Sequence, residues 1–185
     1  DWDVHHGNGT QDMFWNDPRV LYVSLHQRGL FPFTGRVVEV GGPDACGLTV
    51  NVPLPAGVTG DVVRHAVDAV IGPALEQFGP TWLLLSAGFD GHRADPLAEW
   101  ELTSSDFADL TTALVAAAPT ARPVAFLEGG YDLAALRSSV GAVAAVLAGE
   151  QFRQEGPSAG GPGRGDVDAI AGWRFSQSFP LSTHH

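Results

Sequence analysis

The chain has 185 residues, 44% of them hydrophobic, which is enough for one globular domain with an apolar core. Its formal net charge is -11, and it has only 10 basic residues (Lys and Arg). These values argue against direct nucleic-acid binding, because binding to phosphates needs clustered basic side chains. The single cysteine, Cys46, excludes an internal disulfide and a thiolate cluster for zinc, so any metal must be held by His and carboxylates.

The first eleven residues, DWDVHHGNGTQ, carry side chains that can bind a metal at every second position. If this segment is extended, alternate side chains share a face, so Asp1, Asp3 and His5 point the same way. Asp3 and His5 can then reach one ion, since Zn²⁺ accepts nitrogen from His and oxygen from Asp. An isolated Asp-x-His triplet more often belongs to a surface loop, and the segment alone leaves that alternative open.

The residues that follow predict a turn and two strands. Gly7-Asn8-Gly9 is a turn signature, so we expect the chain to reverse there. Residues 19–26 and residues 47–54 are rich in β-formers and predict buried strands. The loop between them, at residues 27–35, contains Phe31 and is unusually apolar, and on local sequence alone a loop packed on the core is as compatible with this as a functional loop.

The later part of the chain alternates helical and extended patterns, which predicts an α/β fold. Helices are predicted at residues 59–75, 105–117 and 133–147, and strands at residues 81–89 and 123–127. Asp90 and Tyr131 come just after the two strands, at the sheet edge where α/β proteins bind ligands. A lone Asp in this position is more often a helix cap, and a lone Tyr is more often a packing residue.

Residues 149–185 change in character, because Gly and Pro accumulate and the aromatic residues show no clear period. This composition predicts a flexible, poorly ordered tail. We find no signal peptide and no apolar run long enough to cross a bilayer, so we expect a soluble, cytoplasmic protein without a membrane partner. The sequence does not indicate an oligomeric state.

Three blocks together resemble the histone deacetylase superfamily, which includes class II deacetylases, bacterial deacetylase-like proteins and acetylpolyamine amidohydrolases. The blocks are DWDVHHGNGTQ, then SAGFDGH with DPL after it, then LEGGYDL. The resemblance covers residues 1–148 and implies a three-layer α/β fold of the arginase/deacetylase type, with a mostly parallel sheet flanked by helices. We expect residues 1–148 to be the C-terminal portion of such a catalytic domain, incomplete at its N-terminus.

The resemblance also implies roles for individual residues. Asp3, His5 and Asp90 would bind one catalytic Zn²⁺ and leave an open position for water and the substrate. Tyr131 would donate its hydroxyl to the oxyanion that forms when water attacks an acetyl carbonyl. Asp1 would lie behind the ligands and orient them.

Further residues follow from the same resemblance. Asn8 joins Asp1 behind the metal ligands, and Phe31 lines the substrate channel together with Gly129 and Gly130. A potassium ion is also implied, bound by backbone and side-chain oxygens. Its expected site comprises Asp1, Asp3, His5, Ser24 and Leu25, although ordinary strand roles for the last two remain equally compatible with the local sequence.

The implied function is a zinc-dependent deacetylase, which hydrolyses an acetyl-lysine side chain or an acetylated polyamine to acetate and an amine. The family transfers protons with two adjacent histidines that precede the metal-binding segment, and the present sequence starts at that segment. His65 and His92 do not resemble this pair, and neither does the pair formed by the last two residues. The alternative is therefore a remnant that binds metal or an acetyl ligand without turnover.

Overall fold

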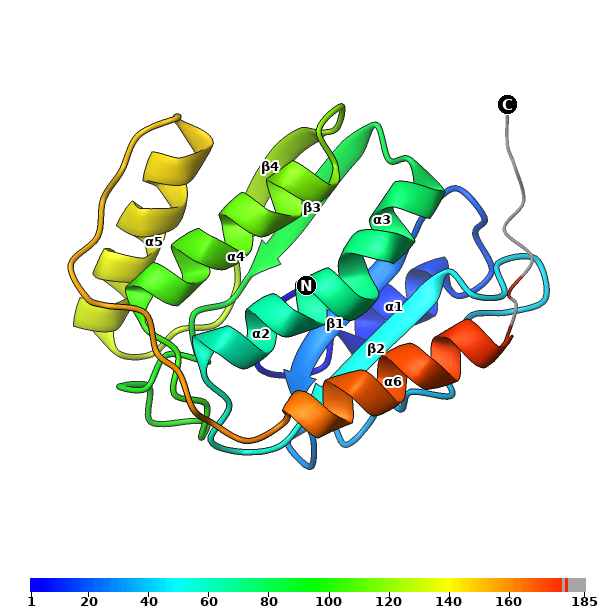
Figure 1. Ribbon diagram of the computed structural model, residues 1–185, viewed down its shortest axis with the longest axis horizontal. Helices are drawn as coiled ribbons and strands as arrows, with labels where there is room; N and C mark the ends of the chain where they lie inside the picture. Colours follow the sequence, from blue (N-terminus) through cyan, green and yellow to red (C-terminus); the bar gives the residue numbers. More distant parts are fainter. Residues whose placement is uncertain (178, 180–185) are drawn as a thin grey trace.

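The computed structural model describes residues 1–177 and residue 179, and its elements confirm the α/β class (Figure 1). The strands are β1 (Tyr22–Gln27), β2 (Thr49–Leu54), β3 (Trp82–Ala87) and β4 (Arg122–Leu127). The helices are α1 (Asn8–Phe14), α2 (Gly60–Ala66), the π-helical η1 (Val67–Ile71), α3 (Gly72–Phe78), α4 (Ser104–Ala117), α5 (Leu133–Leu147) and α6 (Arg164–Gln177).

The strands form two parallel pairs. β1 pairs with β2, with Tyr22 opposite Thr49, and β3 pairs with β4, with Trp82 opposite Arg122. The sequence predicted one mostly parallel sheet, and the pairs are instead separate ladders. Figure 1 shows β1 and β3 facing each other across the centre of the molecule, with helices α2, α3, α4 and α6 in front of the strands and α1 behind them.

The apolar core lies between the strands and the helices in front of them. β2 is buried along its whole length, as a parallel strand covered on both faces should be. The N-terminal segment belongs to the same core, because Trp2 and Val4 are 2% and 0% exposed. Asp1, Asp3 and His5 are half-buried, so the alternation predicted for an extended segment is confirmed.

The helix that follows β2 runs through α2, η1 and α3 without a break. Thr59 occupies the N-cap position of α2, but its hydroxyl donates to the Asp61 carboxylate and does not cap the helix. Pro73 stands in the first turn of α3 and has no backbone N–H to donate, which explains why the preceding turn is π-helical. At α4, Thr103 and Asp106 form a reciprocal capping box.

The chain turns at Gly7, as predicted, because the backbone there has φ -76° and ψ 63° and the N–H of Asn8 donates to the carbonyl of His6 at 2.8 Å, while Asn8 and Gly9 already belong to helix α1. Gly7 has a φ of -76°, which any residue can adopt. Glycine is required at this position for steric reasons, since a Cβ on Gly7 would collide with the carboxylate of Asp1 and with the Tyr22 hydroxyl. Gly7 therefore serves both the turn and a close approach between segments.

A poorly ordered tail was predicted for residues 149–185, but the structure places helix α6 at Arg164–Gln177, while residues 178 and 180–185 of the predicted tail lie outside the described residues. Val167 and Ile170, three residues apart on one face, are 0% and 5% exposed. Ahead of α6, the side chain of Ser158 donates to Asp106 and accepts from the backbone N–H of Gly60. Two apolar positions give too weak a period to be recognised, and polar contacts with distant residues also hold α6, such as those of Arg174 with the carbonyls of Gly47 and Thr49. None of the helices in the described residues is long and apolar enough to cross a membrane.

Candidate metal centre

The three predicted metal ligands meet in the structure. Asp3 and His5 lie on the N-terminal segment, and Asp90 follows β3 in the chain. The Nδ1 atom of His5 lies 3.1 Å from Asp3 Oδ1 and 3.0 Å from Asp90 Oδ2. One ligand atom from each residue lies within 4.8 Å of the other two, which is close enough for all three to bind one ion.

Backbone N–H groups hold both carboxylates in place. Val4 donates its N–H to Asp90 Oδ1 at 3.0 Å, and Gly129 donates its N–H to Asp3 Oδ2 at 3.0 Å. A Cβ on Gly129 would collide with the carboxylates of both Asp90 and Asp3. The resemblance placed Gly129 in a substrate channel, and the structure shows it in direct contact with the carboxylate pair.

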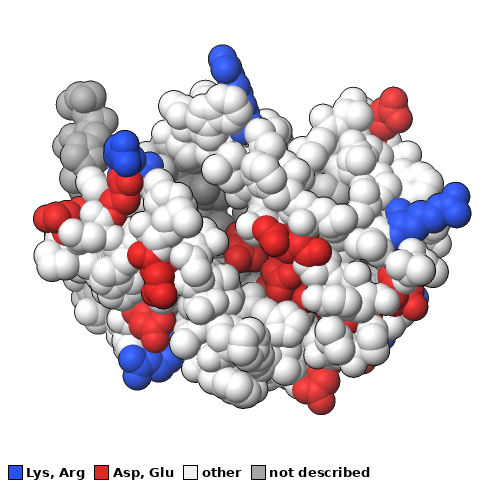
Figure 2. All heavy atoms as spheres, turned by 180° about the vertical axis from the view of Figure 1, so that it is seen from behind, with Lys and Arg blue, Asp and Glu red and all other residues white. Residues whose placement is uncertain are grey.

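The electrostatics of this cluster favour a bound cation. Burial raises the pKa of Asp90 to about 6, and the negative charge of Asp3 contributes to the same rise. Two carboxylates and one imidazole nitrogen are a donor set that suits Zn²⁺, and a cation between them relieves the repulsion. The residues present therefore fit a zinc ion. Figure 2 shows acidic side chains gathered near the middle of one face, with Arg side chains around its edges.

Asp1 lies next to the ligands, whereas Asn8 does not join them. The carboxylate of Asp1 accepts the backbone N–H of Asp3 at 3.0 Å, so it steadies the ligand segment. Asn8 is the first residue of α1 and is exposed. Within residues 1–177 and 179, its side chain makes no hydrogen bond.

The residues expected around potassium cluster beside Asp1. Leu25 donates its N–H to the backbone carbonyl of Asp1 at 3.0 Å, and Ser24 is fully buried on the same strand. The hydroxyl of Ser24 lies 3.0 Å from the Nδ1 atom of His26 and is therefore already engaged. The structure thus brings these residues together, with the Ser24 side chain turned towards His26.

Tyr131 is held by a residue to which the sequence assigned no role. Its backbone N–H donates to Asp95 Oδ2 at 2.6 Å, and Asp95 is only 7% exposed. The Tyr131 side chain is 58% exposed and follows Gly130, whose φ of 134° is difficult for a residue with a Cβ. The only sequence signal for Asp95 was its place before Pro96, where we interpreted it as part of a motif without a function.

Phe31 projects into solvent from its loop and is 72% exposed. Packing on the core is therefore wrong for this side chain, although Leu30 does pack against the core. The base of the loop is anchored, because Thr34 Oγ1 lies 2.7 Å from His6 Nδ1 and the carbonyl of Gly35 lies 3.0 Å from His26 Nε2. A held loop with an exposed aromatic tip is compatible with a surface that contacts a ligand.

His65 and His92, the two further histidines considered in the sequence analysis, both contact carboxylates from other parts of the chain. His92 Nε2 lies 3.0 Å from Glu155 Oε2, and its Nδ1 accepts the backbone N–H of Ala94 at 3.1 Å. His65 Nε2 lies 2.6 Å from a carboxylate oxygen of Asp168. Both rings thus serve contacts with other parts of the chain.

The protein belongs to the α/β class, with parallel strands flanked by helices. Its carboxylate and imidazole cluster lies at the sheet edge where proteins of this class bind ligands. The family model described as "Histone deacetylase domain" matches residues 1–147. The chain belongs to the histone deacetylase family.

Curated relatives and solved structures are similar to the chain over most of its length. Histone deacetylase 10, chloroplastic, from Oryza sativa subsp. japonica is 44% identical over 153 residues, which is 81% of this chain and 34% of the relative. A probable deacetylase from Archaeoglobus fulgidus is 43% identical over 136 residues, which is 72% of this chain and 38% of the relative. The crystal structure of the HDA15 HD domain has a TM-score of 0.84 and 35% identity, covering 95% of this chain and 49% of that one. The chain thus spans about a third of the length of these curated relatives.

Proposed function

We propose that the protein is a zinc-dependent deacetylase that hydrolyses the acetyl amide of acetyl-lysine or of an acetylated polyamine. The observation that carries this proposal is the convergence of Asp3, His5 and Asp90 in a chain of the histone deacetylase family. Zinc, when bound, would supply Lewis acidity for the acetyl carbonyl and would lower the pKa of water. The cytoplasm remains the expected compartment, although one relative is named as chloroplastic.

The chain's own residues would position the substrate and stabilise charge. The hydroxyl of Tyr131 would donate a hydrogen bond to the carbonyl oxygen as negative charge develops there, a contribution of about 3 kcal/mol for a well-aimed donor. Asp95 would fix the backbone from which that side chain projects. Phe31 would contact the alkyl chain of the substrate, with Gly129 and Gly130 leaving room for it.

A potassium ion is part of the proposal as a structural ligand beside the zinc site. The residues that would hold it are Asp1, Asp3, His5, Ser24 and Leu25. Leu25 and Asp1 are already joined through their backbones, so the ion would tie the ligand segment to β1. An oxygen-rich site of this kind suits a hard cation.

Proton transfer is the step of the proposed reaction that the residues of this chain support least. His92 is 4% exposed and engaged with Glu155, so it is poorly placed to accept a proton from water. This observation favours the second candidate function for the chain by itself, which is metal binding with little or no turnover.

Zinc content measured on two purified proteins tests the metal site. The unaltered chain should bind about one Zn²⁺, and Asp90→Ala should lose most of it because one of three ligands is gone. Asp68→Ala is the matched control, since Asp68 is an exposed carboxylate on η1. Equal zinc content in the Asp90 variant and the control would mean that Asp90 is not a zinc ligand.

An acetyl-lysine peptide and an acetylated polyamine, assayed in parallel with the zinc-loaded chain, test the reaction. Zinc binding without acetate release from either substrate is the result that the second candidate function predicts. Rapid turnover that disappears in Asp90→Ala would confirm the deacetylase proposal and reject the candidate without turnover.

A further inference from the structure

The loop that follows β1 is tied to the segment that carries two of the metal ligands. At its start, Gln27 donates its N–H to the carbonyl of Val4 at 2.8 Å, and near its end Thr34 Oγ1 lies 2.7 Å from Nδ1 of His6. Val4 and His6 are the chain neighbours of the ligand His5. The tip of the loop lies between these two anchors and is therefore held close to the metal centre.

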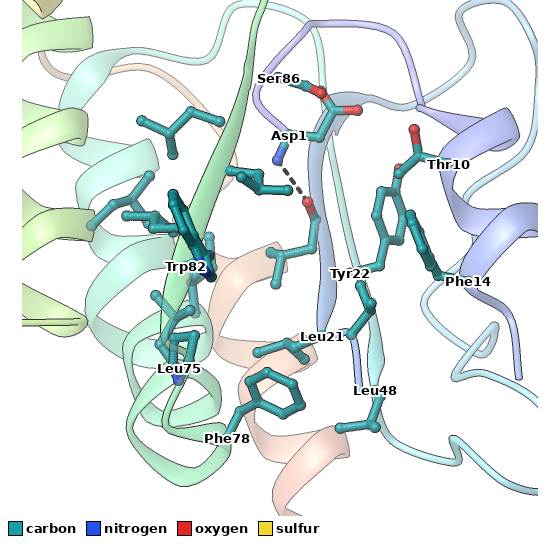
Figure 3. Close-up of a pocket in the computed structure, with 18 of the residues that line it drawn as sticks. Asp1, Thr10, Phe14, Leu21, Tyr22, Leu48, Leu75, Phe78, Trp82 and Ser86 are labelled. Atoms are coloured by element: carbon teal, nitrogen blue, oxygen red, sulfur yellow. Dashed lines mark hydrogen bonds between the residues drawn. The ribbon is translucent and has the colours of Figure 1, made fainter. Parts of the chain in front are cut away.

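The segment that provides these anchors is itself fixed on both sides. The carbonyl of Asp1 accepts the N–H of Leu25 in β1 at 3.0 Å, and Trp2 donates its N–H to the carbonyl of Ser86 in β3 at 3.1 Å. Figure 3 shows Asp1 beside Ser86, between the ribbons of β1 and β3. Because both strands hold this segment, the position of the loop relative to the metal ligands is well defined.

Phe33, at the loop tip, combines an exposed ring with a backbone conformation that residues with a Cβ rarely adopt. Its φ is 64°, and among the residues that the structure describes it is the only one other than glycine with a positive φ. Its N–H donates to the carbonyl of Leu30 at 2.8 Å, which closes a turn that Gly or Asn would form with less strain. The side chain gains no packing in return, since it is 76% exposed. Backbone strain without a gain in packing is more common at ligand sites than elsewhere.

The loop tip is apolar and carries no charge. Residues 29–33 are Gly-Leu-Phe-Pro-Phe, and the adjacent Arg28 is engaged with Asp166 at 3.0 Å. Phe31 is also exposed, and in the part of the chain that the structure describes neither ring pairs with another aromatic side chain. Burying an aromatic ring against an apolar group contributes more than a cation–π contact at an exposed site. The tip therefore suits an apolar side chain better than a charged amine.

We propose that Phe33 is a specificity-determining residue, which contacts an apolar side chain next to the acetylated lysine of a peptide substrate. This inference rests on the proposed deacetylase function and narrows its substrate class to acetylated polypeptides. An acetyl-lysine that reaches the metal centre leaves its neighbouring residues beside the loop tip. An acetylated polyamine has no apolar side chain in that position for the ring to bury.

Binding of two fluorescent peptides to the zinc-loaded full chain tests the proposal. One peptide contains Phe-acetyl-Lys-Phe and the other contains Ser-acetyl-Lys-Ser. We expect the unaltered chain to bind the first peptide about tenfold more tightly, because its apolar side chain is buried against the ring. Phe33→Tyr should keep this preference, since the ring remains.

Phe33→Asn should lose most of the preference for the apolar peptide. Asparagine tolerates a positive φ, so this variant removes the ring and leaves the conformation of the loop unchanged. Phe175→Asn is the matched control, because Phe175 is 90% exposed on α6, and it should bind both peptides as the unaltered chain does. Three results would overturn the proposal: no preference in the unaltered chain, no binding of either peptide, or a preference that survives in Phe33→Asn.

An unacetylated Phe-Lys-Phe peptide separates this inference from the proposed function. If it binds as tightly as the acetylated form, the deacetylase function is contradicted, whereas a preference for Phe that depends on Phe33 would still support the contact. Urea unfolding gives an independent readout. Phe33→Gly and Phe33→Asn should be at least as stable as the unaltered chain, because both residues adopt a positive φ more readily. A clear loss of stability in both variants would mean that Phe33 supports the fold, and it would refute the proposal.

Discussion

Replacing Glu155 with Gln should destabilise the protein by an amount that depends on pH. One carboxylate oxygen of Glu155 accepts from the backbone N–H and hydroxyl of Ser104 and lies 3.0 Å from His92 Nε2. The other accepts from Arg93 at 2.6 Å. The side chain thus joins the segment before α6 to the start of α4 and to the loop after Asp90.

The size of the effect follows from the pKa of this carboxyl group. Partial burial raises the pKa of Glu155, but the hydrogen bonds from Ser104 and His92 outweigh burial and lower it from 4.5 to about 2. This pKa difference corresponds to about 3 kcal/mol of unfolding free energy. Because Glu155 lies near the surface, solvent screening reduces its expected contribution to ~1–2 kcal/mol. The pKa of Glu155 is lower in the folded protein than in the unfolded chain. The stabilisation from its carboxylate is therefore complete above pH 4.5 and is lost as the pH falls towards 2.

Urea unfolding followed by tryptophan fluorescence at pH 6.5 and at pH 3 measures this difference. The unfolding free energy of Glu155→Gln should fall below that of the unaltered protein by ~1–2 kcal/mol at pH 6.5, and by less than half of that at pH 3. Glu150→Gln is the matched control, because Glu150 is exposed. The same loss at both pH values, or a loss no larger than that of the control, would refute this account.

Two further substitutions test the site. Gly129→Ala should weaken zinc binding at least tenfold, because the added methyl group collides with both carboxylates, whereas Gly172→Ala on α6 meets nothing within 4 Å and should bind zinc normally. Unchanged zinc affinity in Gly129→Ala would mean that the carboxylates move apart freely. In any form of the protein that deacetylates a peptide, Tyr131→Phe should lower kcat about 100-fold with zinc content intact. An unchanged kcat would assign Tyr131 to packing.

Local patterns were sufficient to predict most of the fold. The predicted helix at residues 133–147 matches α5, because its Ala- and Val-rich face packs on neighbouring helices and Asp132 caps its start. The period of two in residues 1–6 correctly separated core residues from possible ligands. In both cases the information lies within a few neighbouring residues.

The features that the sequence did not reveal depend on distant contacts. Helix α6 is fixed by Arg174, which donates to the carbonyls of Gly47 and Thr49, and no local pattern encodes that pairing. Asp95 likewise acquires a role only because the fold brings it to the backbone of Tyr131, 36 residues further along the chain. The break between the strand pairs was also not predicted, since periodicity identifies strands and leaves their neighbours undefined.

The alternation of Trp2, Asp3, Val4 and His5 means that the same short segment fills the core and presents the ligands. The third ligand, Asp90, is brought near them only after a long stretch of chain has been ordered. An unfolded copy of this protein therefore has no preformed site, and the free energy of metal binding adds directly to the free energy of folding. A substitution that damages the core around Trp2 and Val4 should therefore also weaken metal binding at the candidate site.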